Sequence, residues 1–410
     1  MEKRSGYNIP IAKPVFKGNE AELIQQALNS GWVSQGPLVE QFEQSVAKYT
    51  QAKHAVATTS CTTALHIAML INNIGPGCDM LCPSYSFIAS ANGVSHAGAT
   101  PCFVDIDPAT LNMCPQETKK VIAESYTKNA NGTLVNKKTG NKLAGIVLVH
   151  QIGIPADIDT FAAICRENNI VLIEDTACGI GSVYKKTPLG GSGFVNALSF
   201  HPRKVITTGE GGMLLMSDDK LDEASRMWRA HGASISDFAR HKSGSTVYET
   251  YDVKGYNYRM TDIQAAIGLK QMEMLEGLIQ RRIEIGKRFN EAFASIENIE
   301  IISPASYVGR WNYQSYPVRL RADNSINADA ESKKRDAVMH ELTEMGIATR
   351  RGIPPIHKES VYANGLTLKN TESVSRRSFF LPIFPTLKDD EVGYIIESVT
   401  KAVKAKALVG

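Results

Sequence analysis

Short apolar segments alternate with longer amphipathic segments along the first half of the chain. The apolar segments lack the polar alternation of a half-exposed sheet, so they predict buried, mostly parallel strands with helices on both faces. The expected strands cover residues 54–59, 80–82, 101–107, 144–151, 169–175, 197–200 and 212–217. The expected helices are a pair within 20–49, broken at Ser30-Gly31, and others near 60–70, 86–96, 115–124 and 157–167. Together they predict a large α/β domain.

A long helical pattern over 261–294 follows this domain. Beyond it the sequence predicts strands near 299–302 and 313–320 and helices over 328–345 and 388–404. We therefore expect two domains, a large one over 1–260 and a smaller α/β one over 261–410. The segment 125–142, SYTKNANGTLVNKKTGNK, is polar and rich in turn residues, which predicts a surface excursion such as a hairpin.

Composition excludes several classes of protein. The 410 residues hold 45 Lys plus Arg and 42 Asp plus Glu, a net charge of +3 without blocks, which argues against a strongly electrostatic nucleic-acid binder. The longest uncharged run, between Asp79 and Asp105, contains prolines, serines, Asn92 and His96, so it is no membrane span. No apolar signal-peptide core follows the N-terminus.

The 7 cysteines lie in the first half of the chain, without a C-x-x-C pair or zinc spacing. Their odd number favours free thiols in a reducing cytoplasm and argues against a metal site.

Two candidate binding features fall at expected strand ends, where open α/β sheets bind ligands. In TTSCTTALH a strand runs into a helix, so Ser60, Thr62 and Thr63 can offer hydroxyls and helix amides to a phosphate. Taken alone, Ser60 is better explained as a simple helix cap. In IEDTACGIGS, Asp175 ends an apolar strand, where a carboxylate needs a cationic partner or serves as a loop cap.

Two further features concern a lysine and an aromatic ring. Lys204 lies in SFHPRKVITTGEGGML, between two apolar strands and ahead of Gly209, Gly211 and Gly212. Such a setting favours the lowered pKa of a Schiff-base lysine, although most lysines are solvated surface groups. Phe87 in PSYSFIASAN begins a predicted helix and either stacks on a planar ligand or packs in the core.

The order of these features resembles that of the DegT/StrS-like nucleotide-sugar aminotransferases, fold-type I enzymes that depend on pyridoxal 5'-phosphate (PLP). The similarity spans nearly the whole chain and is most specific in SFHPRKVITTGEGGM. Other similar stretches are GWVSQGPLVEQFE, VDIDPATLNM, VHQIGIPADID, GYNYRMTDIQAAIG and SFFLPIFPTL.

The resemblance implies a role for each matching residue. It implies that Lys204 binds PLP covalently and moves the proton between cofactor and substrate carbons. It implies that Asp175 pairs with the pyridine nitrogen, that Phe87 stacks on the ring, and that Asn257 reaches the phosphate from a neighbouring subunit of a homodimer. The full expected set of cofactor contacts is Ser60, Thr62, Thr63, Phe87, Asp175, Cys178, Ser199, Lys204 and Asn257.

The chain departs from the family pattern at two cysteines. Relatives often carry Gln, His or Glu where this chain has Cys178, so either another group or water contacts the ring hydroxyl, or Cys178 only packs against the ring. Cys61 stands where glycine or alanine is usual. The segment 231–254 is expected either to contact substrate or to form a variable surface loop.

The resemblance implies transfer of an amino group from an amino acid, L-glutamate in this family, to a keto group of a nucleotide-linked hexose. The implied product is an amino sugar for glycan, polysaccharide or antibiotic synthesis. A sugar dehydratase of the same family is the nearer alternative, but it carries histidine in place of the lysine. A non-catalytic regulatory protein on the same fold is the other. Five residues near expected strand ends are either substrate contacts or ordinary surface or interface groups: His201, Arg310, Trp311, Arg350 and Arg351.

Overall fold

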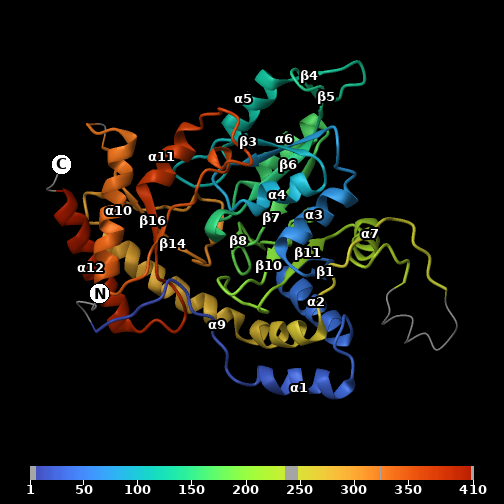
Figure 1. The fold of residues 1–410 in the computed structure, drawn as a ribbon, viewed down its shortest axis with the longest axis horizontal. Helices are drawn as coiled ribbons and strands as arrows, with labels where there is room; N and C mark the ends of the chain where they lie inside the picture. Colours follow the sequence, from blue (N-terminus) through green and yellow to red (C-terminus); the bar gives the residue numbers. More distant parts are fainter. Residues whose placement is uncertain (1–5, 236–247, 324, 408–410) are drawn as a thin grey trace.

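The computed structural model describes residues 6–235, 248–323 and 325–407. A large sheet forms its centre, with the strand order β1–β11–β10–β7–β6–β2–β3 (Figure 1). Neighbouring strands from β10 to β3 run parallel, whereas β11 is antiparallel to both β10 and β1. The strands are β1 (His54–Thr58), β2 (Cys78–Pro83), β3 (Thr100–Val104), β6 (Lys142–Val149), β7 (Val171–Asp175), β10 (Val195–Ser199) and β11 (Gly212–Met216). The predicted, mostly parallel sheet is confirmed.

Helices cover both faces of this sheet. On β7, Ile173 packs in one apolar cluster and Leu172 in another, because alternate side chains of a strand point to opposite faces. One face packs against α3 (Cys61–Ile71), α4 (Ala89–His96) and α7 (Asp219–Arg229). The other packs against α2 (Pro37–Thr50), α5 (Pro115–Ser125), α6 (Ile158–Asn168) and the first half of α9 (Asp262–Phe293), with α1 (Glu20–Ser30) outside α9.

The C-terminal region forms a second, antiparallel sheet in the order β12–β14–β16–β15. Its strands are β12 (Ile299–Glu300), β14 (Tyr316–Leu320), β16 (Ser378–Leu381) and β15 (Arg350–Arg351). The helices beside it are α10 (Ala328–Glu344), α11 (Lys369–Arg377) and α12 (Asp389–Ala407). Among the described helices, none is long and apolar enough to cross a membrane.

Helix α9 connects the two regions (Figure 1). Its Leu275 and Ile279 pack on the central-sheet side, whereas Phe289 and Phe293 belong to the C-terminal core. The N-terminal segment also packs on the C-terminal region, since the Ile9 amide donates to the Gly346 carbonyl at 2.8 Å. The division at residues 260 and 261 therefore stays a prediction.

The predicted excursion over 125–142 contains a hairpin of β4 (Tyr126–Lys128) and β5 (Leu134–Asn136). The fully buried carboxylate of Asp79 anchors it, accepting hydrogen bonds from Tyr126, Asn136 and Asn141 at 2.9, 2.7 and 2.8 Å. Several elements were not predicted from the sequence: α7, α11, β15, β16 and the small sheet of β13 (Val308–Arg310), β8 (Val183–Tyr184) and β9 (Thr187–Pro188). These strands are too short to show a period.

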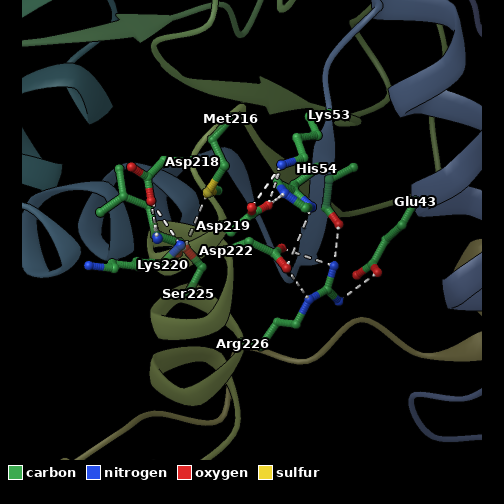
Figure 2. A network of polar contacts seen from close by, with 12 residues as sticks. Glu43, Lys53, His54, Met216, Asp218, Asp219, Lys220, Asp222, Ser225 and Arg226 are labelled. Carbon is green, nitrogen blue, oxygen red and sulfur yellow. Dashed lines mark hydrogen bonds and ion pairs between the residues drawn. The ribbon is translucent and has the colours of Figure 1, made fainter.

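Polar contacts hold α7 against the sheet (Figure 2). Asp218 caps the helix by accepting from the amides of Lys220 and Leu221 at 2.8 and 3.0 Å. Arg226 donates to Glu43 of α2 at 3.0 Å, and the buried Arg229 donates to the same carboxylate at 2.6 Å. Glu43 in turn accepts from the Ala57 amide of β1 at 2.8 Å. One carboxylate thus joins α2, β1 and α7.

Replacing Arg229 with methionine is expected to lower the free energy of unfolding by about 3 kcal/mol, because Glu43 stays buried with less compensation. Arg226→Met is the matched control, since its partly exposed guanidinium pairs with the same carboxylate. We expect that control to cost less than about 1 kcal/mol. Urea unfolding of both variants measures the difference, and equal losses would contradict this account.

Candidate active site

A cavity of about 1040 Å³ lies between the carboxyl ends of the central strands and the C-terminal sheet. Its walls come from both regions, for example Asp175 at the end of β7 and Phe380 in β16. Seven residues predicted from the sequence line it: Ser60, Thr62, Phe87, Asp175, Cys178, Ser199 and Lys204. The fold therefore brings these side chains to one place.

The first turn of α3 lines this cavity. Ser60 caps the helix, since its hydroxyl accepts from the Thr63 amide at 3.2 Å, and it lines the cavity as well. The helix cap is therefore confirmed, and the phosphate contact of Ser60 stays a prediction. Thr62 also lines the cavity, beside amides at a helix N-terminus that favour negative charge.

Gly212 explains why α3 starts so close to β11. A Cβ at this position would lie 2.2 Å from the Ser60 carbonyl carbon and 2.4 Å from the Cys61 nitrogen, both backbone atoms. A Cβ on Gly211 would lie 2.3 Å from the Thr208 hydroxyl. Gly212 thus permits close approach of the backbone to the helix N-terminus.

Gly212→Ala is expected to displace the first turn of α3 and to weaken binding of inorganic phosphate and PLP at least about tenfold, because the helix amides lose their alignment. Gly277→Ala is the control, since a Cβ at that position would meet no heavy atom within 4 Å. Titration calorimetry with both ligands measures the effect. Unchanged affinity in Gly212→Ala would contradict the role of this close approach.

Asp175 is buried at the end of β7 and held in a fixed orientation. It accepts from the Ser90 hydroxyl at 2.6 Å and from the Ala177 amide at 3.1 Å. The Cys61 sulfur lies 4.0 Å from one carboxylate oxygen. A buried carboxylate with three neutral donors, one of them a weak thiol, has capacity left for a cationic group.

Lys204 lies beside a thiol. Its Nζ donates to the Cys178 sulfur at 3.2 Å. Burial alone would lower the pKa of Lys204, but Cys178, Cys61 and Asp175 outweigh it and raise this pKa above its ordinary value. The lowered lysine pKa expected from the sequence is therefore wrong for this structure, because the surrounding acidic groups favour the ammonium.

Phe87 is 75% exposed and forms part of the cavity wall just ahead of α4. The alternative of a core aromatic is therefore wrong, and its ring face remains accessible to a planar ligand. Ser199 is buried at the end of β10 and lines the same cavity.

Two predicted residues do not line the cavity of this chain. The Thr63 hydroxyl accepts from the Ser60 amide at 3.1 Å, which completes a capping box, and donates to the Ser60 carbonyl at 2.8 Å. Its phosphate contact stays a prediction. Asn257 is exposed and accepts from Arg259 at 3.1 Å. The adjacent Tyr258 carbonyl accepts from the Thr59 amide at 2.9 Å, so this segment runs beside the start of α3.

The candidate substrate contacts divide in the same way. His201, Arg350 and Arg351 line the cavity. Arg310 and Trp311 do not: Arg310 pairs with Glu276 at 2.9 Å, and the buried Trp311 donates to the Ile152 carbonyl at 3.1 Å. Of the expected substrate loop, residues 236–247 lie outside the described residues.

Ser90 was missed by the sequence analysis, although its hydroxyl orients Asp175. Its position one helical turn after Ser86, whose hydroxyl lies 2.8 Å away, is the only available signal. Gln314 was missed as well; it lines the cavity and donates to the Arg203 carbonyl at 3.0 Å. No motif marks it.

A helix N-terminus, a buried carboxylate and a lysine at the carboxyl ends of one parallel sheet define an α/β enzyme of the fold-type I class. The model of the DegT/DnrJ/EryC1/StrS aminotransferase family matches residues 14–400, and the chain belongs to this family. It is thus an aminotransferase whose family depends on PLP, and both the class and the cofactor predicted from the sequence are confirmed.

Among its relatives is the spore coat polysaccharide biosynthesis protein SpsC of Bacillus subtilis (strain 168), 32% identical over 410 residues, with 98% of this chain and 99% of SpsC covered. The aminotransferase TlmJ from Streptoalloteichus hindustanus is 27% identical with a TM-score of 0.83, covering 97% of this chain and 99% of TlmJ. Spr1654 from Streptococcus pneumoniae, solved in a PLP form, is 26% identical with a TM-score of 0.84, covering 98% and 100%.

Proposed function

We propose that this protein transfers an amino group from an amino acid, L-glutamate in the first instance, to a keto group of a nucleotide-linked hexose. The product would be an amino sugar for polysaccharide, glycan or antibiotic assembly, in line with the polysaccharide role in the name of SpsC. The observation that carries the proposal is the convergence of Lys204, Asp175 and the α3 N-terminus in one large cavity.

The residues present fit PLP by their chemistry. The α3 amides with Ser60, Thr62 and Ser199 would hold its phosphate, Phe87 would face its ring, and Asp175 would hold its ring nitrogen. When bound, PLP supplies an electron sink for negative charge on the carbon next to the transferred nitrogen. Asp175 favours a proton on the ring nitrogen, because it is a buried anion with spare acceptor capacity. Lys204 moves a proton at Nζ.

Both alternatives are less well supported. A dehydratase of this family would carry histidine in place of Lys204, whereas this chain has the lysine amine in the cavity. A non-catalytic protein would not need to keep both Lys204 and the buried, oriented Asp175.

A panel of nucleotide-linked ketosugars, incubated with glutamate and the PLP-loaded protein, tests the proposal by product mass. The expected product differs from its ketosugar by replacement of the carbonyl oxygen with an amine and hydrogen, together with formation of 2-oxoglutarate. The panel should vary the nucleotide and place the keto group at C3 or C4. Loss of water without amine transfer would instead support the dehydratase.

We further propose a cytoplasmic homodimer in which Asn257 reaches the phosphate of the neighbouring subunit. Its exposure, and its absence from the walls of the cavity of its own chain, support this role. Lys204→Ala and Asn257→Ala chains, each inactive or weak alone, are expected to recover up to about a quarter of normal activity when mixed, because random pairing restores one complete site in half of the dimers. Mass spectrometry of intact dimers confirms exchange, and exchanged dimers without recovery would contradict shared sites.

A further inference from the structure

The thiol of Cys178 faces the amine of Lys204 inside the cavity. Lys204 Nζ lies 3.2 Å from Cys178 Sγ, and both residues line the cavity wall. A hydrogen bond between an amine and a thiol allows the shared proton to reside on either atom. The contact is therefore a pathway for a proton as well as a positional restraint.

The main chain fixes the position of this sulfur. The buried Asn312 side chain donates to the Cys178 carbonyl at 2.8 Å and to the Ile180 carbonyl at 2.9 Å. Gly153 packs so close that a Cβ there would lie 2.8 Å from the Cys178 carbonyl oxygen. The turn after β7 is thus held from two other segments, and Cys178 presents its thiol at a defined place.

Several titratable groups face this pair from the surrounding elements. Asp175 and Cys61 act on the Lys204 charge from β7 and α3, and Lys204 acts in turn on His201. Arg203 and Glu210 also line the cavity. The Asp175 carboxylate and the thiols of Cys178 and Cys61 favour the ammonium form of Lys204, whereas a lysine that acts as nucleophile and base must be neutral.

The surroundings favour the ammonium, but the reaction needs the neutral amine. A thiolate at hydrogen-bond distance can supply the neutral amine by accepting a proton from the ammonium. Of the acidic groups that act on Lys204, the Cys178 thiol is the one in a hydrogen bond with the amine, at 3.2 Å. Burial disfavours a separated ion pair relative to the neutral amine and thiol. Transfer of one proton breaks an N–H bond on Nζ and forms an S–H bond on Sγ. The reverse step restores the ammonium and the thiolate.

We propose that Cys178 is a positioning residue that holds the Lys204 amine inside the cavity and exchanges one proton with it. The catalytic consequence rests on the proposed function of Lys204, but the thiol–amine coupling itself does not. The coupling can therefore be measured without turnover.

The first test measures alkylation of Cys178 by iodoacetamide as a function of pH, in the full-length chain freed of PLP, by peptide mass mapping. In Lys204→Met the midpoint of this profile is expected to rise by at least about one pH unit, because the thiolate loses its cationic neighbour. Cys114, which is partly exposed and contacts Gln116, serves as the internal reference thiol and should keep its profile. An unchanged Cys178 midpoint overturns the proposal.

The second test uses the PLP-loaded protein and follows its visible absorbance against pH. Cys178→Ala is expected to move the midpoint by about one pH unit, and Cys178→Ser, which keeps a hydroxyl at this place, by less. A thiol that only fills space would leave the midpoint of both variants at the wild-type value, which would overturn the proposal. Borohydride labelling of another lysine would instead overturn the proposed function and leave the measured coupling intact.

Discussion

Lys204→Ala is expected to abolish amine transfer, with a loss of at least about 10⁴-fold, and to remove the covalent attachment of PLP at the same time. One amine performs both tasks, so both observables should disappear together. PLP should still bind without a covalent bond, because Ser60, Thr62, Phe87 and Asp175 remain in the cavity. Lys185→Ala, at a surface lysine paired with Asp159, is the control and should retain both properties.

Borohydride reduction followed by peptide mass mapping decides the assignment. A pyridoxyl group on any lysine other than Lys204 would show that the residue has been misassigned. Lys204→His is the more informative variant, since it introduces the residue of the dehydratases of this family. We expect it to lose transamination without gaining efficient dehydration, because the rest of the cavity is unchanged.

The fold was predictable where local periodicity was strong. Helix α9, expected over 261–294, spans Asp262–Phe293, and its Thr261 capping box fixes the start. The buried strand expected to end at Asp175 does end there. By contrast, α7 was missed because its sequence, DKLDEASRMWR, is strongly polar and is held by contacts with distant residues such as Glu43.

The sequence indicated which residues line the site better than it indicated their contacts and their pKa values. Strand ends bring Ser60, Asp175 and Lys204 together, because parallel strands end at the same edge. The pKa of Lys204 could not be obtained in this way, since its direction depends on the 3.2 Å contact with Cys178, far away in sequence. Arg310 also looked like a ligand-binding cation, but its partner Glu276 lies on α9.

Asp175→Asn is expected to keep PLP in the cavity but to slow amine transfer about 10²- to 10³-fold. An amide of nearly the same shape can accept from the Ala177 amide through its oxygen and donate to the Ser90 hydroxyl through its nitrogen, so the local structure should persist. The neutral amide, however, no longer favours a proton on the ring nitrogen, so negative charge on the reacting carbon is less stabilised.

Ser90→Ala separates charge from orientation in this test. It keeps the Asp175 carboxylate but removes the donor at 2.6 Å, so we expect a loss of only about tenfold, the effect of one hydrogen bond. Single-turnover kinetics with glutamate, followed by absorbance, compares the two variants at equal PLP occupancy. Near-normal turnover in Asp175→Asn would remove Asp175 from the role proposed for it. A loss in Ser90→Ala as large as that in Asp175→Asn would show that orientation of the carboxylate, more than its charge, sets the rate.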